Sequence, residues 1–456
     1  MLDQTFSAQN LRIVSETEKR RGRVPDLKFF PKVRQKTDIL KERIQDCKDF
    51  RRSQTGKYSD GDQAIYEHLR DMREAARSER DHQLLACLEG VAKNISKKSY
   101  SVEFEKLVGP GGKPVFSLKD DAPEHHYAEK QISKNLRRLY KVKQANRNQI
   151  VSQLADLLDD KFPYHFIRTD VSSFYESIDH SSLMKKLEDD QLLSHTSLRL
   201  TKNILAKFSL LTASCGVGLP RGIGLSSYLA ELYMRDFDEE IRGLEDVVFY
   251  ARYVDDIVVV FAPTPMSSPK GYLPKIEAAL KKKGLSKNQS KTDESKFDSG
   301  GNSLCRTGLQ FDYLGYEFIF NPKPKIRLSA PKQAKYMARL VASFTRYHLQ
   351  KSKNPRNAYR LLLKRVRFLT GNTQLTHNKQ NAFVGIYFSN PHLTERCQLR
   401  GLDGKLKGLT SKLTSQSLKD QLGKLSFVEG YEQKIFRRFH RKNEFRKIVK
   451  AWKYDK

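Results

Sequence analysis

The stretch from Val247 to Phe261, VVFYARYVDDIVVVF, constrains the fold more than any other part of the chain. Two apolar runs rich in β-branched and aromatic residues flank a short break at Asp255 and Asp256, and such runs predict buried strands. Because the break is short, we expect a β-hairpin with two carboxylates at its tip. Adjacent carboxylates at the end of buried strands repel each other unless a cation or water separates them.

Two interpretations of this carboxylate pair are open. Asp is common in turns, because its side chain hydrogen-bonds its own backbone and tolerates turn dihedrals. The alternative is the metal-binding hairpin of a nucleic-acid polymerase. The hairpin alone does not separate the two, so the rest of the sequence has to decide.

The charge of the chain favours a polyanionic partner. The 456 residues contain 84 Lys plus Arg against 53 Asp plus Glu, a net charge of +31, which indicates nucleic acid first. Residues 331–456 alone carry 29 Lys plus Arg against 7 Asp plus Glu. This quarter also keeps its aromatic residues and leucines, so we expect a folded basic domain that holds a phosphate backbone.

Composition also bounds the compartment. Five cysteines are scattered, none in a CxxC pair, which predicts neither a zinc site nor a disulfide framework and fits a reducing cytoplasm. No apolar run approaches the roughly 18 residues of a membrane span, and the N-terminus has no apolar signal region. We therefore expect a soluble, cytoplasmic protein without a membrane partner.

The first third of the chain is expected to be mostly helical. Residues 1–98 are dense in charge and helix formers, and the residues from 100 to 118 alternate around a GPGG turn, which predicts a hairpin. A helical stretch with a basic cluster at 135–147 follows. Its Arg138 and Arg147 are candidates for holding a triphosphate or a template phosphate, although a solvated helix face is the commoner meaning of such a cluster.

A third carboxylate lies at the end of a predicted strand. The segment FIRTDVSSFYESIDH, residues 166–180, predicts a strand that ends at Asp170 and then turns into a helix. Asp170 could cap that helix. It also precedes Asp255 by 85 residues and could join it in one site. Two-metal phosphoryl transfer needs such a set, since Mg²⁺ takes few protein carboxylates and completes its shell with phosphates and water.

The later elements follow from periodicity. A Gly-rich loop at 216–224 leads into a helix whose leucine stripe predicts core packing. We expect a helix at 273–283 and a strand, Gly turn and strand at 311–320. Further helices are expected at 331–349, at 355–370 and near 428–452.

Taken in this order, the blocks resemble a prokaryotic reverse transcriptase of the group that includes retron, group II intron and antiviral-defence enzymes. The resemblance covers about residues 100–350. RTDVSSFYESI is similar to the first palm motif, GLPRGIGLSS to the template- and dNTP-positioning loop and RYVDD to the catalytic hairpin. NQSKT is similar to the motif that follows the hairpin, and YLGY to the primer grip.

The resemblance implies an α+β, right-hand polymerase fold. Fingers and palm, made of antiparallel sheet plus helices, would be followed by a helical thumb and a basic C-terminal domain. The expected parts are a helical N-terminal region at 1–98, fingers at 99–165, palm at 166–325, and thumb with C-terminal domain at 326–456.

It also implies site residues. Asp170, Asp255 and Asp256, with Val171, would bind two Mg²⁺ ions, for which Mn²⁺ can substitute, and Lys291 would help to protonate the pyrophosphate leaving group. Tyr175 falls where the family places the aromatic gate that excludes a ribose 2′-OH. The remaining implied residues are Phe174 beside the gate, Pro220, Arg221 and Gly222 in the positioning loop, and Leu314, Gly315 and Tyr316 in the primer grip.

The departures from the family pattern matter for function. The loop usually reads Pro-Gln-Gly and then Ser-Pro; here Arg221 replaces the Gln, and Ser227 the second Pro, while Glu231 stands for the usual Asn. No HNH signature, RNase H carboxylate set or Cys-rich tail is present. The resemblance therefore favours the defence-associated enzymes, which often work with a noncoding RNA. The implied partners are that RNA as template, dNTPs, the DNA product, and a second protein subunit or a second copy.

Two rival functions remain open. An RNA-dependent RNA polymerase shares the carboxylate hairpin but usually has Asp where Tyr175 stands. A catalytically silent RNA-binding scaffold built on a polymerase fold is the other rival, and the presence of all three carboxylates and of Lys291 weighs against it.

Overall fold

The structure is a computed structural model that describes residues 2–54, 56, 58–109, 112, 114–119, 122–160, 162–263, 271–297, 309–320, 324–375, 382–439 and 444–452. The chain forms two compact units, and each is discontinuous in sequence. Unit 1 consists of Met1–Gln144, Ser173–Phe237 and Lys282–Leu285, and unit 2 of Ala145–Ser172, Asp238–Lys281 and Ser286–Lys456. The part boundaries expected from the sequence stay a prediction.

Unit 1 is mainly helical, as residues 1–98 led us to expect. Its helices are α1 (Ala8–Arg20), α2 (Pro25–Phe29), α3 (Pro31–Ser53), α4 (Asp60–Ser96), α5 (Pro123–Leu139), α7 (His180–Asp189), α8 (His195–Thr212) and α9 (Gly224–Tyr233), with a 3₁₀ turn, η2 (Phe174–Glu176). The helix α10 (Arg235–Arg242) begins in this unit and ends in the other.

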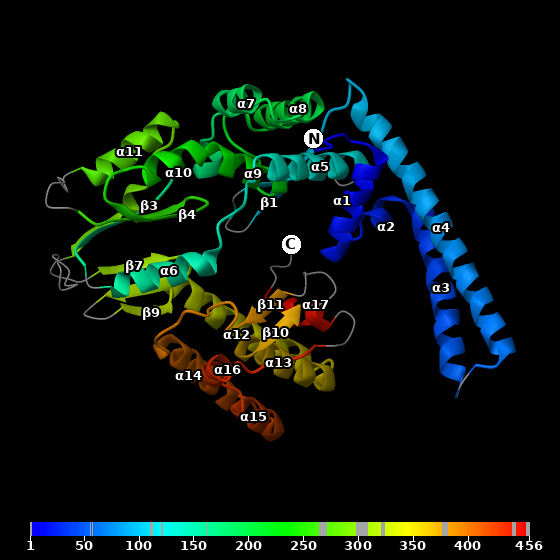
Figure 1. Cartoon of the computed structure of the whole chain (residues 1–456). Coiled ribbons are helices and arrows are strands. Elements are labelled where there is room, and N and C mark those ends of the chain that lie inside the picture. The colour runs from blue at the N-terminus through cyan, green and yellow to red at the C-terminus, as the bar shows by residue number, and fades with distance from the viewer. Residues whose placement is uncertain are drawn as a thin grey trace. The chain divides into compact units, whose positions relative to one another are not determined.

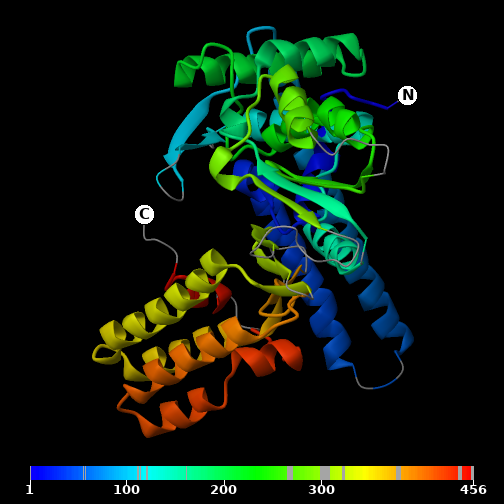
Figure 2. The same ribbon diagram turned by 90° about the vertical axis from the view of Figure 1, so that its left-hand side faces the viewer.

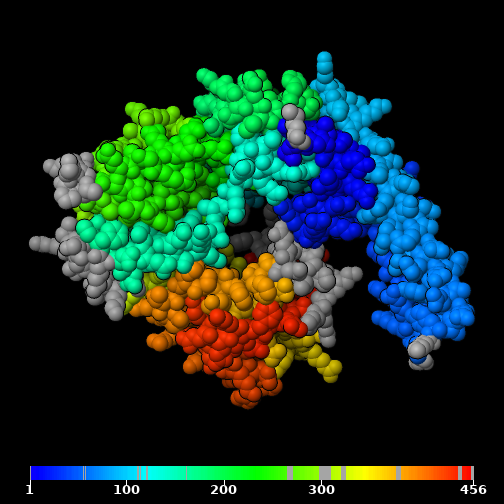
Figure 3. All heavy atoms as spheres, in the orientation of Figure 1, coloured from blue at the N-terminus to red at the C-terminus, as the bar shows by residue number. Residues whose placement is uncertain are grey.

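The helices α3 and α4 form a long pair. They lie side by side (Figures 1 and 2) and present an extended surface to solvent (Figure 3). α4 begins with a capping box, in which Ser59 and Asp62 bond each other's backbone N–H groups. Between residues 36 and 81, Cys47 is the one buried residue among those that the structure describes, so this pair is held by little core.

The expected hairpin at 100–118 is confirmed. β1 (Phe104–Val108) pairs antiparallel with β2 (Pro114–Leu118). The leucine stripe of α9 is also confirmed as core, because Leu225, Leu229 and Leu232 are buried.

In unit 2 a four-stranded antiparallel sheet carries the carboxylates. The strand order is β4 (Val247–Tyr253), β5 (Asp256–Phe261), β3 (Tyr164–Asp170) and β6 (Asp293–Phe297). The apolar run of β5 from Ile257 to Phe261 is fully buried, which is why this stretch reads as uninterrupted hydrophobic sequence. The hairpin is confirmed, with one refinement: Asp255 lies in the turn, whereas Asp256 is the first residue of β5.

A second antiparallel sheet packs into the same core. It consists of β7 (Leu309–Tyr313), β8 (Tyr316–Phe320) and β9 (Pro324–Leu328). The ring of Phe311 lies 5.0 Å from that of Phe318 and 4.5 Å from that of Phe166 on β3. The helix α6 (Arg147–Asp159) adds Val151 and Leu154 to this core.

The C-terminal part of unit 2 is a helical stack that includes one hairpin (Figures 1 and 2). Its elements are α12 (Ala330–Lys351), α13 (Pro355–Thr370), β10 (Asn372–Leu375), β11 (Ala382–Gly385), α14 (Cys397–Ser411), α15 (Gln416–Gly423), α16 (Phe427–Glu432) and α17 (Glu444–Val449). The four-stranded sheet of unit 2 is flanked by α11 (Tyr272–Lys282) and the 3₁₀ turn η3 (Gln289–Lys291).

One helix expectation is wrong. The single helix expected near 428–452 is replaced by α16 and α17, and residues 434–439 between them are not helical. The helix stops because Lys434 takes a positive φ of 51°, after which Phe436 pairs with Asn372 of β10. The hairpin of β10 and β11 was not expected either.

The architecture confirms the α+β class, with antiparallel sheets and helices in one chain. Among the helices in the described ranges, none combines the length and apolar character needed to cross a bilayer.

Candidate active site

The turn that carries Asp255 has a strained backbone and is held by hydrogen bonds to its carbonyl groups. Val254 has a φ of 61°, a conformation that β-branched residues rarely adopt and that clusters at functional sites. The buried Arg252 donates two hydrogen bonds to the carboxylate of Asp238, at 2.7 and 2.8 Å, and a third to the carbonyl of Val254 at 3.0 Å. The N–H of Val171 donates to the carbonyl of Asp255 at 3.0 Å. The turn is therefore fixed by Arg252 on β4, which is anchored to α10, and by Val171 at the end of β3.

Asp170 is held at the end of β3 by the motif that contains Lys291. Its side chain is 7% exposed, and its Oδ2 accepts from Lys291 Nζ at 2.9 Å and from Asn288 Nδ2 at 3.3 Å. The N–H of Asn288 also donates to the carbonyl of Asp170 at 2.7 Å. The hydrogen bond from Lys291 to Asp170 raises the pKa of the ammonium above its ordinary value. A protonated Lys291 therefore lies against the carboxylate of Asp170.

Asp256 lies directly opposite Asp170 in the register of β3 and β5. Burial raises the pKa of Asp256; the guanidinium of Arg168 lowers it in part, and the charges of Asp255 and Asp170 raise it again. Arg168 donates to Asp256 Oδ1 at 3.3 Å and to Asp293 Oδ2 at 3.1 Å. The three carboxylates thus feel one another's charge, with one arginine as partial compensation.

This arrangement fits divalent cations without forming a complete cage. Within the described residues, no three His, Cys, Asp or Glu side chains form a cluster that would hold a metal ion by themselves. Mg²⁺ usually takes one or two protein carboxylates and completes its shell with substrate phosphates and water. The charges of Asp255 and Asp170 both act against ionisation of Asp256, and Asp170 already accepts a cation, so positive charge is favoured here.

In unit 1 the expected gate residue is tied to the positioning loop. Arg221 donates to both carboxylate oxygens of Glu176, at 2.7 and 2.8 Å, and its guanidinium lies 5.5 Å from the ring centre of Tyr175. The N–H of Leu219 donates to the carbonyl of Tyr175 at 2.7 Å. Phe174 is buried and its ring lies 5.4 Å from that of Tyr175. Arg221 therefore holds Glu176 and lies beside the ring of the expected gate residue.

The positioning loop packs tightly against β2. Gly222 has a φ of +103°, and a Cβ there would lie 2.5 Å from Val115 Cγ1 and 2.6 Å from the carbonyl oxygen of Phe116. The carbonyl of Arg221 accepts from the N–H of Phe116 at 2.6 Å, and that of Pro220 from Ser226 Oγ at 2.7 Å. Only glycine fits this close approach.

The expected primer-grip turn in unit 2 is bound by Arg147. Leu314 and Gly315 both have positive φ, 48° and 77°, as a two-residue hairpin turn requires. Arg147 Nε donates to the carbonyl of Leu314 at 2.7 Å, and its guanidinium lies 4.9 Å from the ring centre of Tyr316. Burial and the charge of Arg147 lower the pKa of Lys332, which lies over the same ring, to about 7. In this structure Arg147 supports the turn.

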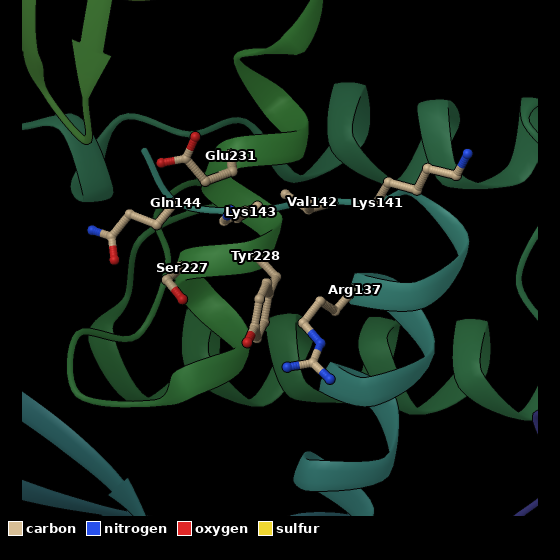
Figure 4. A pocket seen from close by; sticks show the side chains of 8 residues that line it. All are labelled: Arg137, Lys141, Val142, Lys143, Gln144, Ser227, Tyr228 and Glu231. Carbon is tan, nitrogen blue, oxygen red and sulfur yellow. The ribbon is translucent and has the colours of Figure 1, made fainter. Parts of the chain in front are cut away.

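Arg138 lies elsewhere, on a basic cavity of unit 1. This cavity of about 420 Å³ lies between α1, α5 and the start of α9, and Arg138 lines it together with Lys134 and Arg21. A neighbouring cavity of about 470 Å³ shares Arg137 and Tyr228 with it (Figure 4). Neither cavity is lined by the three aspartates.

Sequence reasoning gave no role to several residues that shape the site. These are Arg168, Asp238, Arg252 and Asn288, which position the aspartates or the turn. A signal existed for Arg168, because residues two apart on a strand point to the same face, and Arg168 precedes Asp170 by two. For Asp238 no local signal existed.

Residues 124–318 match the family model described as "Reverse transcriptase (RNA-dependent DNA polymerase)". The chain contains a reverse transcriptase domain. The matched range includes all three aspartates, Lys291 and the residues expected to form the gate, the positioning loop and the primer grip. The protein is accordingly an enzyme of the nucleotidyltransferase class, an RNA-directed DNA polymerase.

Solved structures give a weaker likeness. Telomerase from Candida albicans in complex with a TWJ fragment of telomeric RNA is 13% identical, covers 82% of this chain and 77% of its own, and has a TM-score of 0.37. Apo telomerase from Candida tropicalis is 14% identical, with 78% and 63% covered and a TM-score of 0.37. A search of curated proteins gave no match.

Proposed function

We propose that this reverse transcriptase copies a noncoding RNA into DNA by two-Mg²⁺ nucleotidyl transfer and works in antiviral defence in the cytoplasm. The observation that carries the catalytic part is the cross-strand pairing of Asp170 with Asp256 beside the clamped turn of Asp255. The defence role is supported by the resemblance to defence-associated enzymes, and the cytoplasm by cysteines that are free wherever the structure describes them.

The three aspartates would have different roles in metal binding because they lie at different places in the site. Asp170 and Asp255, with the carbonyl of Val171, would hold the ions, and Asp256 would support them from the start of β5. Bound Mg²⁺ would lower the pKa of a primer 3′-OH and neutralise charge on the triphosphate. Lys291, held protonated at Asp170, would supply a proton to the pyrophosphate that leaves.

The gate would set the sugar specificity. Tyr175, braced by Arg221, would exclude the 2′-OH of a ribonucleotide, so the enzyme should prefer dNTPs. Incorporation of dNTPs and NTPs should be compared in the wild type and in Tyr175→Ala. A gain of NTP incorporation in the variant supports the gate, whereas wild-type preference for NTPs would establish an RNA polymerase instead.

The decisive experiment combines purification with synthesis. The protein is isolated from cells, co-purifying nucleic acid is sequenced, and Mg²⁺ with labelled dNTPs is added. One discrete small RNA and DNA complementary to it would support the proposal; activity on any supplied primer–template without a bound RNA would contradict a dedicated template.

A matched variant tests the site itself. Asp255→Ala should abolish synthesis and leave the circular dichroism spectrum and the bound RNA unchanged, because Asp255 is partly exposed in a turn. Polymerisation retained in Asp255→Ala would overturn the catalytic assignment. No incorporation by the wild type with bound RNA and Mg²⁺ would favour the silent scaffold.

A further inference from the structure

Three phenylalanines form an exposed cluster in the C-terminal part of unit 2. Phe383 is 53% exposed, Phe436 40% and Phe388 36%. The ring of Phe383 lies 5.2 Å from that of Phe388 and 6.0 Å from that of Phe436. We call these three residues the phenylalanine cluster. Contiguous exposed apolar side chains mark interaction sites rather than ordinary surface.

One buried side chain ties together the backbone segments beneath the cluster. Asn372 is 1% exposed, and its Oδ1 accepts from the N–H groups of Tyr387 at 2.9 Å and Phe388 at 3.3 Å. Its Nδ2 donates to the carbonyls of Gly430 at 3.0 Å and Ile435 at 3.3 Å.

The remaining backbone contacts complete this support. The carbonyl of Asn372 accepts from the N–H of Arg437 at 2.7 Å, directly after Phe436, and Phe383 stands opposite Gln374 in the β10–β11 register. All three aromatic residues are therefore attached to one hydrogen-bonded scaffold, and its strands β10 and β11 lie beside α13 (Figure 1). A site that is ordered before binding loses little entropy when a ligand arrives.

The charge around the cluster is positive. Arg437 and Arg438 follow Phe436 directly, and Lys434 lies 4.6 Å from the ring centre of Tyr387. Glu432, the acidic residue nearest in sequence, is already engaged, since it lies 3.6 Å from Arg396. The segment 434–439 thus combines an exposed aromatic ring with three cations and contains no carboxylate.

We propose that the phenylalanine cluster binds unpaired bases of a single-stranded RNA, with the phosphates held by Lys434, Arg437 and Arg438. Aromatic side chains next to a basic track are the general means of binding single strands, because every base has a face that stacks. This inference extends the proposed function, since an associated RNA offers unpaired bases outside any duplex in the active site. A protein partner is the alternative that the test below excludes or establishes.

The test measures the binding of a fluorescein-labelled oligo(U) RNA of about 20 nucleotides by anisotropy, against an RNA duplex of equal length, without dNTPs. Phe383→Ala and Phe436→Ala should each weaken single-strand binding about 5- to 150-fold and duplex binding less than about twofold. Phe383→Trp should retain the affinity. The matched control is Leu349→Ala, which removes a 63% exposed apolar side chain from α12 and should change nothing.

Two further variants separate the contribution of base stacking from that of the phosphate contacts. Phe383→Leu keeps apolar area and the fold but loses the stacking face, so it should bind as weakly as Phe383→Ala. Arg437→Ala should reduce the slope of log K against log salt by about 0.7, whereas the phenylalanine variants should leave that slope unchanged.

Several results would overturn the proposal. Single-strand affinity that is unchanged in both alanine variants, or wild-type affinity in Phe383→Leu, shows that the cluster does not stack bases. A smaller apparent size of Phe383→Ala in gel filtration, with RNA affinity unchanged, establishes a protein interface instead. Because binding is measured without dNTPs, an enzyme that fails to synthesise DNA would refute the proposed function and leave this measurement intact.

Discussion

The clamp behind the Asp255 turn makes a quantitative prediction for Arg252→Met. The side chains of Arg252 and Asp238 are 4% and 14% exposed, and two hydrogen bonds of 2.7 and 2.8 Å join them. Removing the guanidinium leaves a nearly buried carboxylate with Tyr250 as its hydroxyl donor at 2.6 Å. Breaking a buried ion pair from one side costs about 3–5 kcal/mol. We expect the free energy of unfolding, measured in urea by circular dichroism, to fall by that amount.

The double variant Arg252→Met/Asp238→Leu is the matched control. It removes both charges, so it should recover most of the stability that the single variant loses. Activity should not recover, because Val254 also loses the hydrogen bond to its carbonyl, and a displacement of the turn of about 1 Å can cost roughly 100-fold in kcat. A loss below about 1 kcal/mol in Arg252→Met, or equal instability of both variants, would refute this reasoning.

Three other predictions follow from local geometry. Gly222→Ala should lower the free energy of unfolding in urea by more than about 2 kcal/mol and weaken DNA synthesis. The control Gly216→Ala also changes a glycine at positive φ (+82°), but a Cβ there would meet open space, so the free energy of unfolding should fall by about 1 kcal/mol. Burial lowers the pKa of His126 to about 4, so the neutral ring stabilises the fold above pH 6.5 and this contribution is lost as the pH falls toward 4. The free energy of unfolding, measured in urea, should be about 2 kcal/mol lower at pH 5 than above pH 6.5. His126→Phe should remove this part of the pH dependence of the free energy of unfolding. Arg221→Gln should change stability by less than about 1 kcal/mol, because the ion pair with Glu176 is exposed, yet it should raise NTP relative to dNTP incorporation by loosening the gate.

The sequence predicted the elements whose signals are local. The hairpin around Asp255 and the helix at 355–370 follow from runs of apolar residues or from helical period, and both are confirmed. The resemblance added an order of blocks, and Lys291 was found at Asp170 although 121 residues separate them.

What the sequence could not predict depends on distant partners. The strands of β10 and β11 have four residues each and weak strand character, and they are held by Asn372 and by Ile435 more than 60 residues later. The same pairing interrupts the expected C-terminal helix. The paired hydrogen bonds from Arg252 to Asp238 likewise depend on a tertiary contact, which local propensity does not encode.

The position of β3 in its sheet has a consequence for how the enzyme is made. β3 is an inner strand, and its neighbours β5 and β6 end at Phe261 and Phe297. The ribosome adds about 5–20 residues per second, so the strand that carries Asp170 emerges roughly 6–25 s before its second neighbour is complete. Both of its edges are open until β5 is complete, and the edge that pairs with β6 stays open to other nascent chains until Phe297 has emerged. Slower translation before Phe297 should therefore increase aggregation during synthesis, and a chaperone that covers extended apolar segments should raise the yield of active enzyme.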